Sequence, residues 1–169
     1  QRLVDWTGLV LETADGPGTR YVAQVEGNGL SARRTLRFVP GEPRLNKREE
    51  DTPFGPMEWF DTAFVNTRRL DDSFHISVGN LPKGSKGGVT PGQVLATFQG
   101  WLDYQLGPVQ RTAVIADRGP GFHYSRSQPP RWTEGIVVVR QGRLYHAQAS
   151  VRNPADRRVK TFLESFEVK

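Results

Sequence analysis

The sequence predicts an α+β domain built on an antiparallel sheet. Short segments of alternating apolar and polar residues recur along the chain, separated by glycine- and proline-rich turns, as is typical of antiparallel strands. Residues 90–106 instead follow a helical repeat between a capping signal and a stop. The chain ends in a hairpin followed by a helix. Because no internal repeat or interior linker interrupts it, we expect residues 1–169 to form a single domain.

Five strands are expected before the helix. The first two pair across Asp15-Gly16-Pro17-Gly18, a cluster of turn-forming residues. Residues 42–56 are polar and punctuated by prolines, which predicts a long loop, and residues 83–88 predict a flexible glycine-lysine loop. The expected strands lie at residues 3–12, 19–25, 35–39, 57–65 and 74–78.

The helix over residues 90–106 is the clearest element of the sequence. Thr90 is placed to cap it, Pro91 suits the first helical position, and Gln93 completes a capping box. Gly107-Pro108 supplies the stop. The apolar stripe that should face the core consists of Val94, Leu95, Phe98, Trp101, Leu102 and Leu106.

The C-terminal part predicts four strands and a second helix. Residues 109–116 and 122–125 are expected strands, and residues 132–151 form a hairpin with Gln141-Gly142 at its turn. Asn153 is the expected cap of the final helix, with Asp156 in its first turn. The stripe predicted to be buried is Val159, Phe162, Leu163 and Phe166.

Composition excludes some classes of site and leaves others open. The absence of cysteine excludes disulfides, thiolate catalysis and cysteine-ligated metal centres. No apolar run is long enough to predict a membrane span. The net charge is +5, but acidic residues accompany the scattered arginines, so a solvated surface is the simpler interpretation than a nucleic-acid face. No leader precedes Gln1, so an export signal is expected to have been removed or never to have existed.

The order of several short motifs resembles the PsbP-like superfamily, which includes a photosystem II accessory protein, a Ran-binding import protein and bacterial lipoproteins. The residues that carry the resemblance are 38–43, 74–82, 142–147 and 162–166. The resemblance implies an α/β/α sandwich around an antiparallel sheet, with a core over residues 33–168 and an extra N-terminal hairpin over residues 1–30. It also implies a mostly non-enzymatic class without a shared catalytic motif, so no catalytic residue is carried over.

Other chemical interpretations are weaker. His75 and His146 could face one side with a carboxylate such as Asp72, but a metal site needs three or four convergent ligands, and we expect no metal and no cofactor. Residues 84–88 lack the spacing of a phosphate-binding loop. No serine has a nucleophile-elbow setting, and no catalytic residue is predicted.

The segment over residues 122–132 is the best binding candidate, because it mixes aromatics, arginines and prolines of the kind found at recognition hot spots. The alternative is that Phe122 and Tyr124 fill the core while Trp132 caps the hairpin. Lys83 and Lys86 could contact an anionic partner. The candidate binding residues are Phe122, Tyr124, Arg126, Arg131, Trp132, Lys83 and Lys86.

These patterns predict a non-enzymatic accessory domain of a secreted or periplasmic bacterial protein that acts through contact with another protein. Any membrane association would come from a lipid anchor upstream of Gln1. The first alternative is a module that binds a small ligand or an anion in a cleft between the sheet and the Thr90 helix. The second is an arginine-driven nucleic-acid binder. An enclosed apolar pocket with a few convergent polar groups would favour the ligand module.

Overall fold

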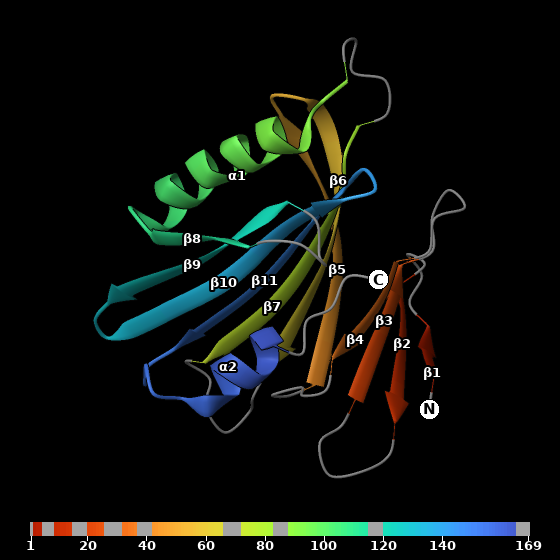
Figure 1. Ribbon diagram of the computed structural model, residues 1–169. Coiled ribbons are helices and arrows are strands. Elements are labelled where there is room, and N and C mark those ends of the chain that lie inside the picture. Colours follow the sequence, from red (N-terminus) through yellow and green to blue (C-terminus); the bar gives the residue numbers. More distant parts are fainter. Residues whose placement is uncertain are drawn as a thin grey trace.

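A computed structural model describes the backbone of residues 2–4, 9–14, 20–25, 32–36, 42–65, 72–82, 88–114 and 120–164. Side chains are described within residues 46–63, 72–82, 88–112 and 120–164. Within these ranges the chain forms two antiparallel sheets and two helices (Figure 1).

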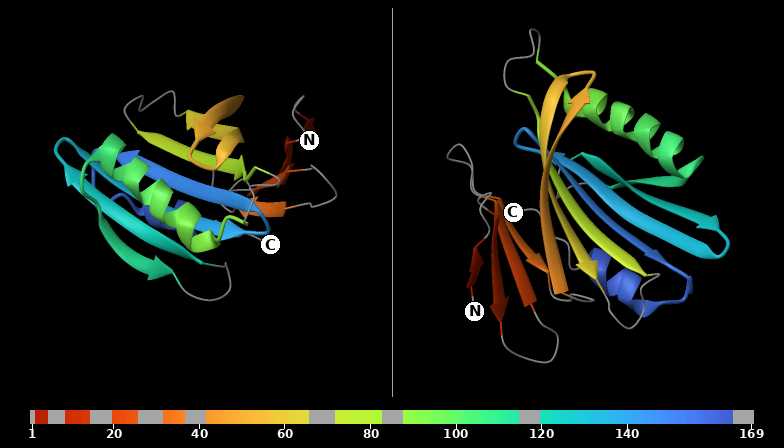
Figure 2. Two further views of the ribbon diagram at one scale, coloured as in Figure 1. Left: turned by 90° about the horizontal axis from the view of Figure 1, so that it is seen from above. Right: turned by 180° about the vertical axis from the view of Figure 1, so that it is seen from behind.

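The N-terminal sheet has four strands, and its order follows the sequence. Its second and third strands pair as the predicted hairpin, with Leu9 opposite Val25. The sheet is separate from the larger one, so the N-terminal region is more than a hairpin added to a sheet edge (Figure 2). The strands are β1 (Arg2–Val4), β2 (Leu9–Ala14), β3 (Arg20–Val25) and β4 (Ala32–Leu36).

The larger sheet has seven strands in the order β5-β6-β7-β11-β10-β9-β8, and every neighbouring pair is antiparallel. Helix α1 (Pro91–Leu106) connects β7 to β8, and helix α2 (Arg157–Glu164) follows β11. The strands are β5 (Glu42–Thr52), β6 (Gly55–Val65), β7 (Ser73–Asn80), β8 (Gln110–Val114), β9 (Gly121–Gln128), β10 (Arg131–Arg140) and β11 (Arg143–Val151).

The predicted α/β/α sandwich is wrong, because the protein is mostly β structure. In the described part of the chain each face of the seven-stranded sheet carries one helix, and α2 is only eight residues long. A single helix cannot form a layer over seven strands. The predicted core boundary at residue 33 also shifts, because β4 belongs to the small sheet and the large sheet begins at Glu42.

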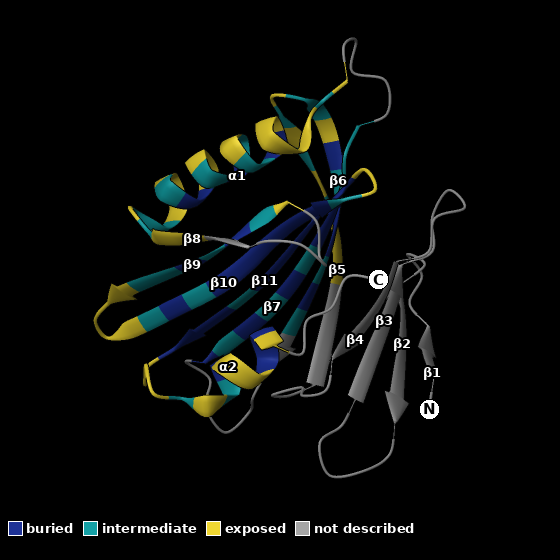
Figure 3. Cartoon of the chain, in the orientation of Figure 1, coloured by how far each residue is buried: buried dark blue, intermediate teal, exposed yellow. Residues whose placement is uncertain are grey.

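Both faces of the central strands are nevertheless buried. In β10, Ile136 and Val138 pack with α2, while Val137 and Val139 pack on the α1 side. Alternate residues of a strand point to opposite faces, so an unbroken apolar run suits a strand that is covered on both sides. Figure 3 shows this burial concentrated in the central strands, whereas the outer side of α1 is exposed.

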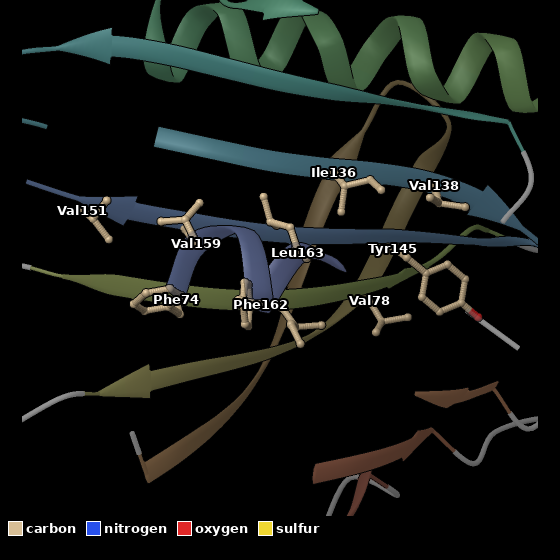
Figure 4. Packing of buried hydrophobic residues seen from close by; sticks show 12 residues of the cluster. Phe74, Val78, Ile136, Val138, Tyr145, Val151, Val159, Phe162 and Leu163 are labelled. Atoms are coloured by element: carbon tan, nitrogen blue, oxygen red, sulfur yellow. The ribbon is translucent and has the colours of Figure 1, made fainter. Parts of the chain in front are cut away.

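Helix α2 closes the face of the sheet opposite α1 (Figure 4). Phe162 packs edge-on against Phe74, with ring centroids 5.3 Å apart. Val159, Phe162 and Leu163 are buried as predicted, and Phe166 lies outside the described residues. The predicted cap is wrong, because Asn153 accepts from the Ala155 N–H in a turn before the helix.

Asp156 takes the capping position instead. Its Oδ1 accepts from the Arg158 N–H, and its carboxylate also pairs with the Arg158 guanidinium. Arg158 additionally pairs with Asp72, which is buried. The capping residue is therefore three positions later in the chain than predicted.

The predicted loop over residues 42–56 is also wrong, because β5 occupies most of it and pairs with β6 over its whole length. Its polar side chains form cross-strand ion pairs. Arg48 Nε lies 2.7 Å from Asp61 Oδ2, and Lys47 pairs with Glu58. Prolines are tolerated in an edge strand, because one row of its N–H groups needs no partner within the sheet.

Two predicted strands are wrong in detail, because residues 3–12 are divided between β1 and β2, which pair with each other, and the strand predicted over residues 35–39 lies at Ala32–Leu36. The main features of α1 and of the terminal hairpin follow the sequence prediction. Thr90 caps α1, and the capping box with Gln93 is complete. The terminal hairpin turns at Gln141 and Gly142, whose φ angles of 50° and 72° suit a tight hairpin turn. No helix among the described residues is long and apolar enough to cross a membrane. Residues 83–87 lie outside the description.

Candidate functional site

A cavity of about 560 Å³ lies between α1 and the facing side of the seven-stranded sheet. Strands β5, β6, β7 and β11 provide one wall, and the tip between β5 and β6 extends it. Helix α1 provides the other wall. The lining residues are Arg48, Glu50, Asp51, Thr52, Pro53, Phe54, Met57, Trp59, Asp61, His75, Ser77, Val94, Thr97, Phe98, Trp101, Leu144, His146 and Gln148.

The antiparallel register brings the polar groups of this wall together. Asp61 lies opposite Ser77, and Ser77 lies opposite His146, so one row of polar residues crosses three strands. His75 and Gln148 are opposite each other in the next row. Residues that are directly opposite in an antiparallel pair share a face, which is why side chains up to about 90 positions apart converge on one cavity.

The Tyr124 side chain extends from β9 across Gly135 of β10 to reach His146 and Gln148. Tyr124 and Gly135 are opposite each other in the register. A Cβ at Gly135 would lie 2.5 Å from Tyr124 Cζ and 2.5 Å from its hydroxyl oxygen. Only glycine leaves room for the ring to lie across the strand.

The Tyr124 hydroxyl joins His146 to Gln148. It lies 2.7 Å from His146 Nε2 and donates to Gln148 Oε1 at 2.7 Å. A phenol has one proton, so His146 must donate from Nε2 to the phenol oxygen. The two residues Gln148 and His146 of β11 are therefore held in fixed orientations at the cavity floor.

Burial keeps these ring groups uncharged. It lowers the pKa of His146 to about 3, with His75 and Arg48 adding repulsion. Burial also lowers the pKa of His75, although Asp61 opposes this shift. The pKa of Tyr124 is raised by burial. At neutral pH the two lining histidines are therefore neutral, and the buried Tyr124 phenol that bonds to His146 is protonated.

Arg48 organises the other end of the cavity. Its guanidinium donates to Asp61 and to Glu50, and it lies 4.9 Å from the ring centroid of Trp59. Burial lowers the pKa of Arg48, but its hydrogen bonds to the two carboxylates outweigh this and raise it overall. Arg48 is therefore a fixed cation that is already neutralised by neighbouring acids.

Two polar atoms in the cavity lining are buried without a hydrogen-bond partner. They are Trp59 Nε1, a donor, and Asp61 Oδ1, an acceptor. Trp59 is only 4% exposed. Buried polar groups in folded proteins are nearly always satisfied, so these two atoms are exceptions, and both belong to residues that line the cavity.

Helix α1 contributes an apolar and mainly aromatic wall. The Phe98 ring packs edge-on against His146 at 5.0 Å and lies 5.1 Å from Trp101. It is also 6.3 Å from Trp59 on the sheet. An aromatic wall facing a few oriented polar groups is typical of small-molecule sites.

The charges around the cavity are mainly negative. Glu50, Asp51 and Asp61 face one arginine, Arg48, and both lining histidines are neutral. Such a lining disfavours an anionic ligand, because the ligand would meet net negative charge in a partly desolvated site.

The structure separates the residues predicted to bind a partner. Phe122 and Tyr124 are buried on the α1 side of the sheet. Trp132 packs on the opposite face with the α2 cluster, and its Nε1 donates to Glu134 at 3.2 Å. Phe122 and Tyr124 thus belong to the core, as the alternative interpretation expected, whereas Trp132, expected to cap the hairpin, is partly buried against the α2 cluster.

The basic residues of the predicted site stay outside these cores. Arg131 is exposed and Arg126 is half-buried, and neither lines the cavity. Lys83 and Lys86 lie outside the described residues. A binding role for these four residues stays a prediction.

The histidines considered as metal ligands do line the same cavity. However, His146 Nε2 is engaged by Tyr124, and Asp72 pairs with Arg158 instead. No group of three or more histidine and carboxylate side chains suited to a metal occurs in the part of the chain that is described.

Sequence reasoning placed a cleft beside the Thr90 helix but missed most of its polar residues. Arg48 lies in the segment over residues 42–56 that is predicted to be a loop. The available signal was Asp61, a carboxylate in the middle of the aromatic strand MEWFDTAF. A charge within an apolar strand is costly unless it is paired or used by a site.

Comparisons with known proteins do not assign the chain to a family. No protein-family model matches the sequence, and the search of curated proteins finds no similar protein. The resemblance to the PsbP-like superfamily therefore stays a prediction.

Proposed function

We propose that the protein is a binding module for a small, largely apolar organic ligand held between α1 and the seven-stranded sheet. The observation that carries this proposal is the cavity of about 560 Å³, which is within the usual size range of ligand pockets. Its apolar wall and its few convergent polar residues support the same function.

A neutral fluorescent probe tests this proposal directly. N-phenyl-1-naphthylamine, whose fluorescence rises in apolar surroundings, should bind the wild-type protein in one saturable site. Thr97 lines the cavity from α1, so Thr97→Trp should fill the space and weaken probe binding about tenfold or more.

Ala96→Trp is the matched control, because Ala96 is the exposed neighbour of Thr97 on the same helix. It should leave binding unchanged. Equal affinity of the Thr97 variant and the control, with both folded, would remove the cavity as the binding site. The absence of saturable binding to the wild-type protein would refute the proposed function.

Contact with another protein is a second proposal. It is supported by the outer side of α1, where Tyr104 is 85% exposed. Exposed tyrosines are common at interaction hot spots. If α1 is a contact surface, Tyr104→Ala should reduce recovery of a bound protein in affinity capture, whereas Gln105→Ala, on the exposed neighbour, should not.

A further inference from the structure

We infer that the ligand carries an uncharged hydrogen-bond acceptor, such as a ketone or ester carbonyl, and that this oxygen binds the side-chain amide nitrogen of Gln148. This inference rests on the proposed function and names the chemical class of the ligand at the same site. Gln148 would thereby select, among apolar molecules that fit the cavity, those with a carbonyl at the right place.

The hydrogen bonds of the cavity wall leave Gln148 as a donor. The Tyr124 hydroxyl lies 2.7 Å from His146 Nε2 and donates to Gln148 Oε1 at 2.7 Å. The amide oxygen of Gln148 is therefore used within the protein. An amide nitrogen carries two N–H groups and accepts no hydrogen bond, so the group that Gln148 has left to offer can only donate.

The amide nitrogen is open to the cavity. Within the described part of the chain Gln148 Nε2 has no hydrogen-bond partner, and it is not one of the side-chain atoms there that are buried without a partner. It is therefore accessible. Gln148 lies on β11, in the middle of the sheet, and lines the cavity, so the open nitrogen faces the cavity rather than the outer surface.

The neighbour of Gln148 on the cavity wall is uncharged. His75 lies directly opposite Gln148 on β7 and also lines the cavity. Residues opposite each other in this way have Cβ atoms about 5 Å apart. Burial lowers the pKa of His75, so its ring is neutral at neutral pH. In the next row Asp61 is already paired with Arg48 at 2.7 Å.

The unbalanced negative charge of the cavity lies at its other end. Glu50 is opposite Met57 of β6. His75, and with it Gln148, belongs to the row of Ala63 on the same strand. Met57 and Ala63 are six positions apart, which is about 20 Å along a strand. The wall around Gln148 therefore suits a neutral acceptor, since no described cation stands there to balance an anion.

An aromatic surface lies beside this donor. His146 precedes Gln148 by two positions on β11, so the two side chains share one face of the sheet. The Phe98 ring packs edge-on against His146 at 5.0 Å and lies 5.1 Å from Trp101. Rings at these separations favour contact with a further ring. A carbonyl attached to a flat ring system can therefore reach Gln148 while its ring contacts α1.

Two probes of nearly identical shape test the inference. 2-Acetonaphthalene carries a carbonyl oxygen, and 2-isopropenylnaphthalene has a CH₂ group in its place. Their affinities are measured by displacement of N-phenyl-1-naphthylamine from the wild-type protein and from Gln148→Met, which removes the amide but keeps the length of the side chain. The substitution should weaken the ketone about fivefold and leave the hydrocarbon unchanged or tighter, because only the ketone loses a hydrogen bond.

Gln99→Met is the matched control. It makes the same substitution on α1 at a residue that does not line the cavity, so the affinities of both probes should stay the same. The hydrocarbon serves as an internal control, because its unchanged affinity for Gln148→Met shows that the cavity is intact.

NMR of the wild-type protein gives a measurement that does not depend on any variant. The side-chain amide protons of Gln148 should shift downfield on addition of the ketone and not on addition of the hydrocarbon. Equal shifts with both probes would contradict a hydrogen bond to the carbonyl.

Tyr124→Phe tests how the amide is oriented. Without the Tyr124 hydroxyl, the Gln148 amide is free to turn its oxygen towards the cavity, where it would accept from a donor such as 2-naphthol. The ratio of ketone affinity to naphthol affinity should therefore fall about threefold relative to the wild-type protein. An unchanged ratio would refute the fixed orientation on which the ligand class depends.

The outcomes separate this inference from the proposed function. If the dye binds in the cavity but Gln148→Met changes the affinities of the ketone and the hydrocarbon equally, the ligand class is wrong and the binding function stands. Tighter binding of the anion 2-naphthoate than of the ketone would likewise overturn the ligand class. If neither the dye nor any naphthalene probe binds, the proposed function itself fails.

Discussion

Replacing Gly135 by alanine tests how the floor of the cavity is built. The added Cβ would meet three Tyr124 atoms, with Cζ and the hydroxyl oxygen at 2.5 Å and Cε1 at 2.6 Å. These separations are too short for any non-bonded contact, and Tyr124 is fully buried, so its ring cannot move aside freely.

The expected cost can be worked out from the contacts. Overpacking a dense core costs about 1–3 kcal/mol. A displaced Tyr124 ring would also lose its hydrogen bonds to His146 and Gln148, at about 1 kcal/mol each. Replacing glycine by alanine also stabilises the protein by about 0.5–1 kcal/mol, because alanine loses less backbone entropy on folding. We therefore expect Gly135→Ala to lower the free energy of unfolding by about 2–4 kcal/mol.

Urea denaturation followed by tryptophan fluorescence measures this change. Gly100→Ala is the control, because nothing lies within 4 Å of a Cβ at Gly100 on the exposed side of α1. It should raise stability by about 1 kcal/mol. In a Tyr124→Leu background, which lacks the clashing atoms, the cost of Gly135→Ala should largely disappear. Unchanged stability of Gly135→Ala in the wild-type background would show that Tyr124 does not cross this position.

Three further outcomes follow from described contacts. In the folded protein the pKa of His146 is about 3, against an ordinary value of 6.5, so the stability that neutral His146 contributes is complete above about pH 6.5 and is lost as the pH falls towards 3. Equilibrium unfolding at several pH values should show the free energy of unfolding falling by about 1.4 kcal/mol per pH unit in this range. His146→Gln should remove this pH dependence. Arg158→Met removes the guanidinium that pairs with the buried Asp72 carboxylate. Denaturation should show the free energy of unfolding lowered by about 3 kcal/mol, and the decrease should be smaller in an Asp72→Asn background. Thr90→Ala breaks the capping box and should lower stability by about 1 kcal/mol in the same assay, whereas Thr161→Ala, on the exposed side of α2, should cost less.

Local sequence signals predicted the elements whose causes are local. The Thr90 capping box and the apolar stripe of α1 act within one helix, so residues 91–106 could be assigned correctly. The turn at Gln141 and Gly142 needs positive φ angles, which glycine adopts easily, so the terminal hairpin was also predictable.

Strand β5 could not be predicted from its own sequence, because its pairing with β6 stabilises it. The segment EPRLNKREEDT has no apolar alternation, and its side chains pair with acids on β6 that local patterns do not reveal. The same limit applies to the site. Asp61, Ser77 and His146 become neighbours only through the register of three strands, and register depends on the whole sheet.

The tip of the β5–β6 hairpin affects which ligands fit the cavity more than it affects the stability of the fold. Its tip residues Thr52, Pro53 and Phe54 line the cavity, yet β5 is an edge strand of the sheet. Insertions or deletions at this tip would resize the cavity with little effect on the clusters that hold the central strands, because of the three tip residues only Phe54 packs against a cluster. Related chains could therefore diverge in the ligands they accept by varying one exposed turn, while selection for folding acts on a different set of residues.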